Sequence, residues 1–281
     1  MERYDKNSKL GTIKTREEGR NFWFRFEVIK DCSFLEKETH DNIKEGIRQL
    51  LTNCWGDFGL DFIERHIIKA TWLLILRKDD EIIGVSAVSK KKMINRIIYY
   101  WEITAISREF QSKNLMKKIN AILFRYIFID NLIKNKSLTV EVMLITPNPK
   151  VLCFLSEVSN FIYPNPFLFN FVNIIKKNIA DEETWIMAKK IISQSDKPNR
   201  IINRNGCVLN GSYTDMPWLI YKENNIPWCY NEIVNNFCRA YLDYEHKQGK
   251  EFIVRSKITP RSLFYYIFRF FRKKYQLDSN F

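Results

Sequence analysis

The sequence predicts a mixed α/β fold in which a mostly antiparallel sheet is flanked by helices. Two apolar, β-branched runs, TWLLILRK and EIIGVSAVSK, are separated by Asp79 and Asp80, which are residues typical of tight turns. A third run, RIIYYWEITAI, is apolar on both faces, as a covered central strand is. A long amphipathic helix follows it, with apolar residues at helical spacing, namely Leu115, Ile119, Ile122, Tyr126 and Ile129.

The remaining elements follow from the same periodicities. Residues 22–29 alternate apolar and charged side chains and predict a half-exposed strand. Between residues 36 and 51, apolar residues at helical spacing predict a helix, with Ile43, Ile47, Leu50 and Leu51 on its buried face. The other expected elements are a short helix at 62–68, a strand at 137–145 and a helix at 151–158.

Beyond Ser159 the pattern is looser. We expect helices at 182–193, 230–244 and 260–274, and strands or hairpins at 201–209 and 218–221. This organisation predicts a flexible arm at 1–21, a core domain at 22–160 and a C-terminal extension at 161–281. Thr259 and Pro260 are suited to cap and begin the last helix.

Composition limits the classes of function. A net charge of +13 suits acidic partners, namely nucleic acid, an anionic membrane or an acidic carrier protein, and it suits a solvated basic surface without any such partner equally well. The six cysteines show no C-x-x-C pair and the three histidines are far apart, so no metal site is expected. The N-terminal residues lack the apolar core of a signal peptide, which favours a cytoplasmic protein with reduced thiols.

Residues 101–116 (WEITAISREFQSKNLM) combine a central strand, a loop and the start of a long helix. With the order of elements from Trp72 to about Val158, this segment resembles the Gcn5-related N-acetyltransferase superfamily. In that family the loop reads Q/R-x-x-G-x-G/A, and Gln111 matches its first position. The family also has an Asn that opens the next helix, and Asn148 matches it.

The resemblance implies that the loop and helix N-terminus bind the pyrophosphate of coenzyme A. The residues implied in donor binding are Ile106, Gln111, Ser112, Lys113, Asn114, Leu115, Met116 and Asn148. The sequence departs from the family at Asn114 and Met116, which occupy the two small positions, and at Val151, where a small residue is usual. The tyrosine that usually protonates the leaving thiolate is replaced by Leu155.

Glu102 is the candidate general base. It lies in the middle of an apolar strand, and two-residue periodicity puts it on one face with Tyr100 and Thr104. A buried carboxylate accepts a proton from an amine more readily than an exposed one. The structural alternative is that Glu102 pairs with a buried Arg or Lys and only holds the sheet. Glu141 is the reserve candidate, ranked lower because carboxylates exposed at strand edges are common.

Two residues that follow the strand at 137–145 are also candidates for chemistry. Tyr163 is a candidate replacement for the missing general acid, against the simpler interpretation that it is a core tyrosine. Cys153 is a candidate nucleophile, but a single cysteine on an apolar helix usually serves packing. Backbone N–H groups of residues 103–106 and 143–146 are expected to stabilise the oxyanion, as the resemblance implies.

The predicted function is transfer of an acyl group from a thioester to a primary amine of a peptide, an amino acid or a small molecule. Acetyl-coenzyme A, a longer acyl-coenzyme A and an acyl carrier protein remain open as donors. The aromatic segment 159–169 favours a longer acyl chain, although ordinary core packing explains it as well. The last helix is aromatic and basic, which suits either peripheral membrane contact or docking on the sheet. The alternative function is a nucleic-acid-binding or nucleic-acid-modifying protein on a degenerate acyltransferase scaffold.

Overall fold

The computed structural model describes residues 8–17, 20–168, 179–195, 200–211, 226–244 and 249–265. The chain forms two compact units, and β4, β5 and α3 each contribute residues to both. The first unit comprises Met1–Lys91 and Tyr99–Asp130, and the second comprises Lys92–Ile98 and Asn131–Phe281.

The first unit contains five strands and the helices that cover them. In chain order these are β1 (Ser8–Glu17), β2 (Arg20–Lys30), the 3-10 turn η1 (Cys32–Phe34), α1 (Lys37–Trp55), α2 (Gly59–Ile63), the π-helical turn η2 (Glu64–Ile68), β3 (Trp72–Lys78), β4 (Glu81–Met93), β5 (Arg96–Ile106), the 3-10 turn η3 (Arg108–Lys113) and α3 (Leu115–Asn135).

The second unit contains short strands and shorter helices. These are β6 (Val140–Thr146), α4 (Pro149–Val158), β7 (Phe161–Tyr163), the 3-10 turn η4 (Pro166–Leu168), α5 (Glu182–Ser193), β8 (Ile202–Asn203), β9 (Val208–Leu209), α6 (Glu232–Leu242) and β10 (Glu251–Ile258).

Strands β1 to β5 follow one another in the sheet of the first unit, and the pairs β1–β2, β2–β3 and β3–β4 are antiparallel. Asp79, in the β3–β4 turn, has a φ of 54°, a conformation that Asp tolerates better than most residues. The mostly antiparallel sheet of the predicted fold class is therefore confirmed. Residues 8–17 differ from the expected flexible arm, because they pair along their length with β2.

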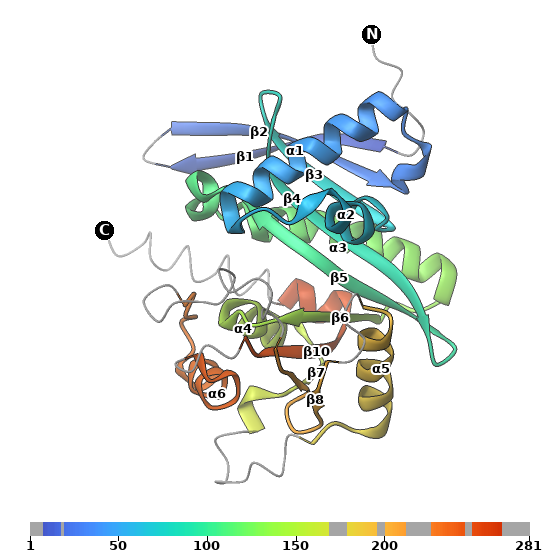
Figure 1. Ribbon diagram of the computed structural model, residues 1–281, viewed down its shortest axis with the longest axis vertical. Coiled ribbons are helices and arrows are strands. Elements are labelled where there is room, and N and C mark those ends of the chain that lie inside the picture. The colour runs from blue at the N-terminus through green and yellow to red at the C-terminus, as the bar shows by residue number, and fades with distance from the viewer. Residues whose placement is uncertain are drawn as a thin grey trace. The chain divides into compact units, whose positions relative to one another are not determined.

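Helices cover both faces of β3, β4 and β5, with α1 and α2 on one face and α3 on the other (Figure 1). The expected buried positions of α1 are all confirmed, and its buried residues are Ile43, Ile47, Leu50, Leu51 and Cys54. In α3 the predicted face was partly wrong, because Ile129 is 49% exposed whereas Leu123 and Ile127 are buried. This helix is apolar around much of its circumference, so two helical registers fit the sequence equally well.

In the second unit the strand order is β6-β10-β9-β8, and β7 also pairs with β10. Strand β10 was not expected from the sequence, although it lies between β6 and β9 in the sheet of the unit. Its side chains alternate between two faces. Phe252 stacks on Phe237 of α6, whereas Arg255 bonds to Thr184 of α5. As a result α5 and α6 lie on opposite sides of β10 (Figure 1).

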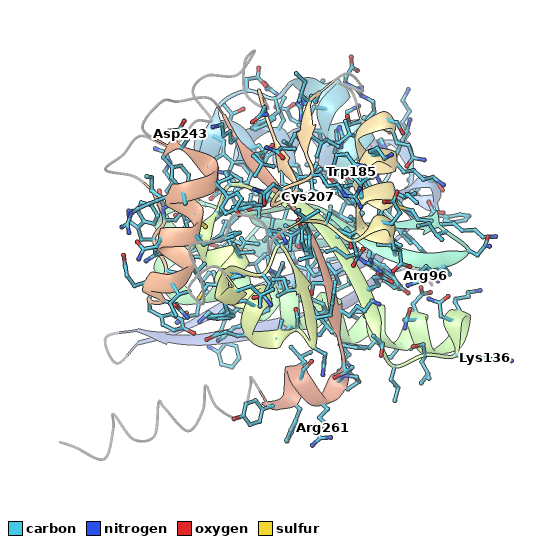
Figure 2. The ribbon with its side chains drawn as sticks, turned by 90° about the horizontal axis from the view of Figure 1, so that it is seen from below. Arg96, Lys136, Trp185, Cys207, Asp243 and Arg261 are labelled. Carbon is cyan, nitrogen blue, oxygen red and sulfur yellow. The ribbon has the colours of Figure 1, made fainter. Side chains whose placement is uncertain are left out.

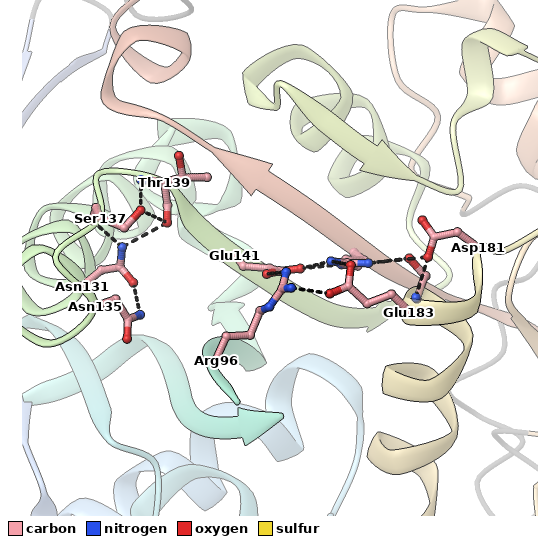
Figure 3. Close-up of polar contacts among 10 residues, drawn as sticks. Arg96, Asn131, Asn135, Ser137, Thr139, Glu141, Asp181 and Glu183 are labelled. Carbon is pink, nitrogen blue, oxygen red and sulfur yellow. Dashed lines mark hydrogen bonds and ion pairs between the residues drawn. The ribbon is translucent and has the colours of Figure 1, made fainter. Parts of the chain in front are cut away.

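The side chain of Arg255 is buried, with 1% of its surface exposed, and it forms ion pairs with three carboxylates that Figure 3 labels, namely Glu141, Asp181 and Glu183. Its Nε lies 2.5 Å from Glu141 Oε1, and its Nη2 lies 2.6 Å from Glu183 Oε2. Arg96, at the start of β5, also contacts both carboxylates. A buried guanidinium without such partners would be strongly destabilising, so this network holds β10, β6 and α5 together.

The C-terminal part contains most of the helices and strands that the sequence predicts there. Helix α5 spans Glu182–Ser193 as predicted, α6 lies within the predicted 230–244, and β8 and β9 lie within 201–209. A helix begins at Pro260 after a reciprocal cap between Thr259 and Ser262, and Arg261 on its first turn is exposed (Figure 2). Residues 218–221, residue 169 and the helix beyond residue 265 lie outside the described residues. None of the helices in the described ranges has the length and apolar character required to cross a membrane.

Candidate active site

The side chains of β5 do not alternate regularly between the faces of the sheet. Trp101 and Thr104 both contact α3, at Phe124 and Asn120 respectively. Between them, Glu102 contacts η2 and Ile103 packs against the core formed with α1 and α2. Two successive side chains therefore lie on one face, which is the irregularity that a β-bulge produces, and bulges are common beside active sites. The prediction that Glu102 shares a face with Thr104 was wrong because the sequence does not mark this break.

Glu102 has a nearly buried side chain, with 7% of its surface exposed, and two partly exposed partners. His66 Nδ1 lies 3.3 Å from Glu102 Oε2, and Lys91 Nζ lies 3.7 Å from Glu102 Oε1. The Lys91 ammonium also lies 4.2 Å from the centre of the Tyr100 ring. With its proton on Nδ1, His66 donates to Glu102 and directs the lone pair of Nε2 away from that carboxylate. A carboxylate that orients an imidazole in this way makes a proton acceptor.

His66 was not a candidate in the sequence analysis. It lies in the helix expected at 62–68, where the structure has a π-helical turn, a local irregularity that is often found at functional sites. The Phe62 ring packs against the His66 ring at a tilt of 33°, with centroids 4.6 Å apart. No spacing in the sequence connects residue 66 with residue 102, and only the packing of α2 and η2 against β5 brings them together.

On the α3 face of β5, a second polar cluster lies among apolar residues. Ser86 and Thr104 hydroxyl oxygens lie 2.8 Å apart, and Trp101 Nε1 donates to both. Asn120 Oδ1 accepts from both hydroxyl groups, at 3.1 Å and 3.4 Å. The donors and acceptors in this cluster satisfy one another, so the cluster fixes α3 against the sheet at the level of Glu102.

The predicted donor-binding residues 106 and 111–116 form the end of β5, η3 and the start of α3. Gln111 Nε2 donates to the Ile106 carbonyl, which folds the loop back onto the strand. Asn114 lies in the left-handed region with φ 56° and ψ 20°, so it adopts the backbone conformation for which the family uses glycine.

Leu115 is buried at the start of α3, whereas Met116 is 39% exposed. Lys113 precedes the helix and Lys117 lies on its first turn, so basic side chains surround a helix N-terminus. Backbone N–H groups of such a terminus attract anions. Of Ser112 the structure describes only the backbone, as part of η3. The assignment of these residues to donor binding remains a prediction.

Asn148 lies in the second unit, at the start of α4. Its Oδ1 accepts from Lys150 N at 2.9 Å, so it caps the helix as predicted. Leu155, at the position of the family's tyrosine, is 3% exposed. Its side chain serves packing and has no acidic group. The contact of Asn148 with a donor remains a prediction.

Glu141 is not exposed at a strand edge, which corrects the reason for its lower rank. It is 7% exposed and bonded to Arg255 and Arg96. The ion pair with arginine that was considered as the structural alternative for Glu102 is found at Glu141, whereas Glu102 pairs with the partly exposed Lys91. Because two guanidinium groups hold it, Glu141 is poorly suited to take a proton from a substrate.

Tyr163 in β7 is 8% exposed, and its hydroxyl donates to the Arg204 carbonyl at 3.1 Å. Burial is the main reason that its pKa lies well above the usual range of tyrosine. Its role as general acid remains a prediction. Cys153 is 2% exposed, and burial followed by its contact with Cys229 raises the pKa of its thiol. A raised pKa disfavours the thiolate, which argues for packing. The described part of the chain has no group of three His, Cys, Asp or Glu arranged to hold a metal ion.

No family model and no curated protein matches the sequence. Three solved structures that are similar to the chain are acetyltransferases or synthases by name. The aminoglycoside 6'-N-acetyltransferase from Enterococcus faecium is 11% identical, with a TM-score of 0.34 and coverage of 83% of this chain and 97% of that one. A possible acetyltransferase from Clostridium difficile 630 is 9% identical, with a TM-score of 0.28 and coverage of 36% and 70%.

The third is N-acetylglutamate synthase from Neisseria gonorrhoeae, complexed with coenzyme A and N-acetyl-glutamate. It is 14% identical with a TM-score of 0.31, and the match covers 46% of this chain and only 27% of that one. Within the chain itself, the order from β2 to α4, with β5 leading through a loop into α3, is the Gcn5-related order that the sequence predicts. The chain has a Gcn5-related N-acetyltransferase-like fold.

Proposed function

We propose that the chain is an N-acyltransferase that moves an acyl group from a thioester to a primary amine. The observation that carries this proposal is the arrangement of β5 in the first unit. This strand holds Glu102 beside His66 and then leads directly to a basic loop at the N-terminus of α3. A proton acceptor and an anion-attracting helix end are the two features that amine acylation by an acyl-coenzyme A needs on one scaffold.

The proposed reaction forms one C–N bond, breaks one C–S bond and transfers two protons. The ammonium of the acceptor first loses a proton to the pair formed by Glu102 and His66, which leaves an amine with a nucleophilic lone pair. The nitrogen then forms a bond with the acyl carbon, and the carbon–sulfur bond breaks. The proton that the nitrogen loses after attack goes to the departing thiolate. The products are an amide and a free thiol.

The donor is an acyl-coenzyme A or an acyl carrier protein, and we favour a medium or long acyl chain. Met116 supports this preference because it is the second residue of α3 and 39% exposed, at a position where the family has a small residue. A pantetheine on a carrier protein needs fewer contacts with the pyrophosphate region than free coenzyme A does. The net charge of +13 favours an acidic carrier.

A thiol-release assay with both kinds of donor, at equal concentration and with a mixture of primary amines, tests the proposal. We expect turnover with the carrier-linked acyl group to exceed that with acetyl-coenzyme A and to fall from low to physiological ionic strength. Lys117→Glu should weaken use of the carrier, whereas Lys134→Glu, an exposed lysine near the end of α3, serves as the control. Tight use of acetyl-coenzyme A that is insensitive to salt would contradict the carrier proposal, and absence of thiol release with every donor would contradict the enzyme.

A further inference from the structure

We infer that the C-terminal segment 259–281 binds the surface of an anionic lipid bilayer as an interfacial amphipathic helix. The inference concerns the second unit alone and does not depend on the proposed reaction. The segment contains five Arg or Lys residues and a single acidic residue, Asp278. It follows directly on β10, and the structure describes it as far as Tyr265.

Polar contacts fix the start of this segment to the second unit. Thr259 and Ser262 cap the helix that begins at Pro260. The Thr259 hydroxyl also donates to Asn160 Oδ1 at 2.9 Å, and the backbone N–H of Asn160 donates to the Lys257 carbonyl at 2.9 Å. The helix therefore begins at a defined point beside the end of β10.

The first turns of this helix present large aromatic side chains to solvent. Phe264 is 70% exposed and Tyr265 is 65% exposed. Together with Asn160, Arg261 and Ser262 they line a hollow of about 360 Å³. Arg261 is exposed and lies at the lower edge of the view in Figure 2. A helix that docks its aromatic side on the sheet would bury Phe264, so this exposure favours contact with a partner outside the chain.

The sequence of the expected helix at 260–274 separates into two faces when successive residues are placed about 100° apart. From Leu263 onward, one half of the circumference is apolar up to the final Lys274, and it contains Leu263, Phe264, Ile267, Phe268, Phe270 and Phe271. The basic residues of the opposite half are Arg261, Arg269, Arg272 and Lys273. Residues 266–274 lie outside the described residues, so their place on these faces is an expectation from the sequence.

A broad apolar face beside a basic face is the pattern of a helix that lies in a membrane interface. The apolar side chains enter the boundary of the acyl chains, and the basic side chains attract anionic headgroups. Tyrosine is enriched at this level of a bilayer, and Tyr265 and Tyr266 belong to the basic half. The apolar face is too short and too often interrupted by charge to cross a bilayer, which takes about 20 apolar residues.

Nucleic acid is the other acidic partner that the basic residues suit. It would contact the basic half of the helix and leave the phenylalanine side chains of the other half in water. A bilayer surface uses both halves at once, because it combines negative charge with an apolar interior. The two-faced pattern and the exposure of Phe264 therefore favour lipid.

Co-sedimentation of the full chain with vesicles tests the inference. One set of vesicles contains phosphatidylcholine alone, and the other is an equal mixture of phosphatidylcholine and phosphatidylglycerol. We expect the chain to bind the anionic vesicles about tenfold or more tightly than the neutral ones. This preference should shrink as the salt concentration rises, because salt screens the attraction between the basic face and the headgroups.

One variant on each face, each with a matched control, locates the contact. Phe264→Glu should weaken binding to anionic vesicles about tenfold or more, whereas Ile201→Glu, at an apolar side chain that is 71% exposed in the same unit, should leave it unchanged. Arg261→Glu should weaken this binding about tenfold, whereas Lys190→Glu, at an exposed lysine of α5, should have little effect. Each variant and its control change the net charge equally, so a difference between them reports on position.

Equal binding to both kinds of vesicle, or equal effects of a variant and its control, would overturn the inference. Phe264→Glu should also keep the wild-type thermal midpoint, and a large fall in that midpoint would overturn the inference by showing that the aromatic face packs within the protein. Two further results would assign the segment to another partner. One is binding of a single-stranded RNA oligonucleotide, weakened by Arg261→Glu, without any binding to vesicles. The other is self-association that Phe264→Glu abolishes, again without binding to vesicles.

Discussion

Two carboxylates in the middle of strands, Glu102 in the first unit and Glu141 in the second, have the same burial and different partners. Each side chain is only 7% to 8% exposed. Glu141 bonds to Arg255, whose side chain is 1% exposed, at 2.5 Å. Glu102 has a partly exposed histidine at 3.3 Å and a lysine at 3.7 Å. Glu102 therefore lies beside groups that solvent reaches, whereas Glu141 is bonded to a buried guanidinium whose positive charge is permanent.

This difference shows how a strand carboxylate that holds a sheet can be told from one that is suited to chemistry. A guanidinium keeps its proton at all accessible pH values. A carboxylate bonded to a guanidinium therefore has no partner that can accept a proton from a substrate. An imidazole gains and loses a proton near neutrality. Burial alone does not separate the two roles. The nature and exposure of the partner separate them.

The largest expected effect concerns Glu141, the carboxylate that holds β6, β10 and α5 together through Arg255. Glu141→Gln should lower the free energy of unfolding by about 3 kcal/mol, because it leaves Arg255 buried with less compensating charge. Urea unfolding followed by circular dichroism measures this loss. Glu102→Gln, whose partners are partly exposed, should cost about 1 kcal/mol or less. Similar losses for the two variants would remove the distinction between them.

The second prediction concerns the pair formed by Glu102 and His66. His66→Gln and Glu102→Gln should each lower turnover by about a hundredfold, which is typical for loss of a general base. If the two groups act as one proton acceptor, as we propose, the double variant should lose little more than either single variant. Steady-state thiol release gives all three values. Independent, multiplying losses would show that the two side chains act separately.

The third prediction concerns acid stability. Burial by itself would raise the pKa of Asp130, but hydrogen bonds from Lys90 and Tyr99 and the charges of Lys90 and Lys30 outweigh it, so this pKa lies below its usual value. A lowered pKa in the folded state stabilises the protein above the unfolded pKa of about 4, and this stability is lost as pH falls through the folded pKa. The free energy of unfolding should therefore fall with pH below about 5.

Asp130→Asn should flatten this part of the profile, and urea unfolding at a series of pH values measures it. In the second unit Glu183 behaves in the same way, since the hydrogen bond and charge of Arg255 lower its pKa against the opposing effect of burial. Glu183→Gln should therefore also flatten the profile. If the free energy of unfolding rises as the pH falls below about 5, or if neither variant changes its pH dependence, this account of Asp130 and Glu183 is contradicted.

The smallest expected effect is at the start of α4. Asn148→Ala should cost about 1 kcal/mol, because the Lys150 N–H loses its cap. Asn148→Asp keeps an acceptor oxygen and should retain most of that stability. If Asn148 also binds the donor, both variants should raise the KM for the donor. An unchanged KM in both would limit Asn148 to capping.

Much of the fold could be predicted, because periodicity and turn residues are local signals. The runs around Asp79 and Asp80 form β3 and β4, and α5 has the predicted bounds. β1 was missed because its sequence, SKLGTIKTRE, is polar, and it becomes a strand only by pairing with β2. β10 was missed because Arg255 interrupts its apolar pattern, and only the carboxylates of other elements make that arginine acceptable in a core.

The candidate site could be predicted only in part, for a related reason. Glu102 stood out as a charge in an apolar strand, and the left-handed conformation of Asn114 agrees with the expected tolerance of asparagine there. The partner of Glu102 did not stand out, because His66 is distant in sequence and lies in an unremarkable helical pattern. The face of Glu102 also depended on a break in strand alternation, which no residue type in β5 announces.

The most direct test of the central claim is turnover of Glu102→Gln and Glu141→Gln, each compared with its own unfolding midpoint in the same preparation. We expect Glu102→Gln to keep nearly the wild-type midpoint and to release thiol about a hundred times more slowly in the presence of a primary amine. Glu141→Gln should lose stability and, below its lowered midpoint, retain most of its turnover. Full activity in Glu102→Gln, or a loss of activity explained by its unfolding, would contradict the assignment of this carboxylate to catalysis.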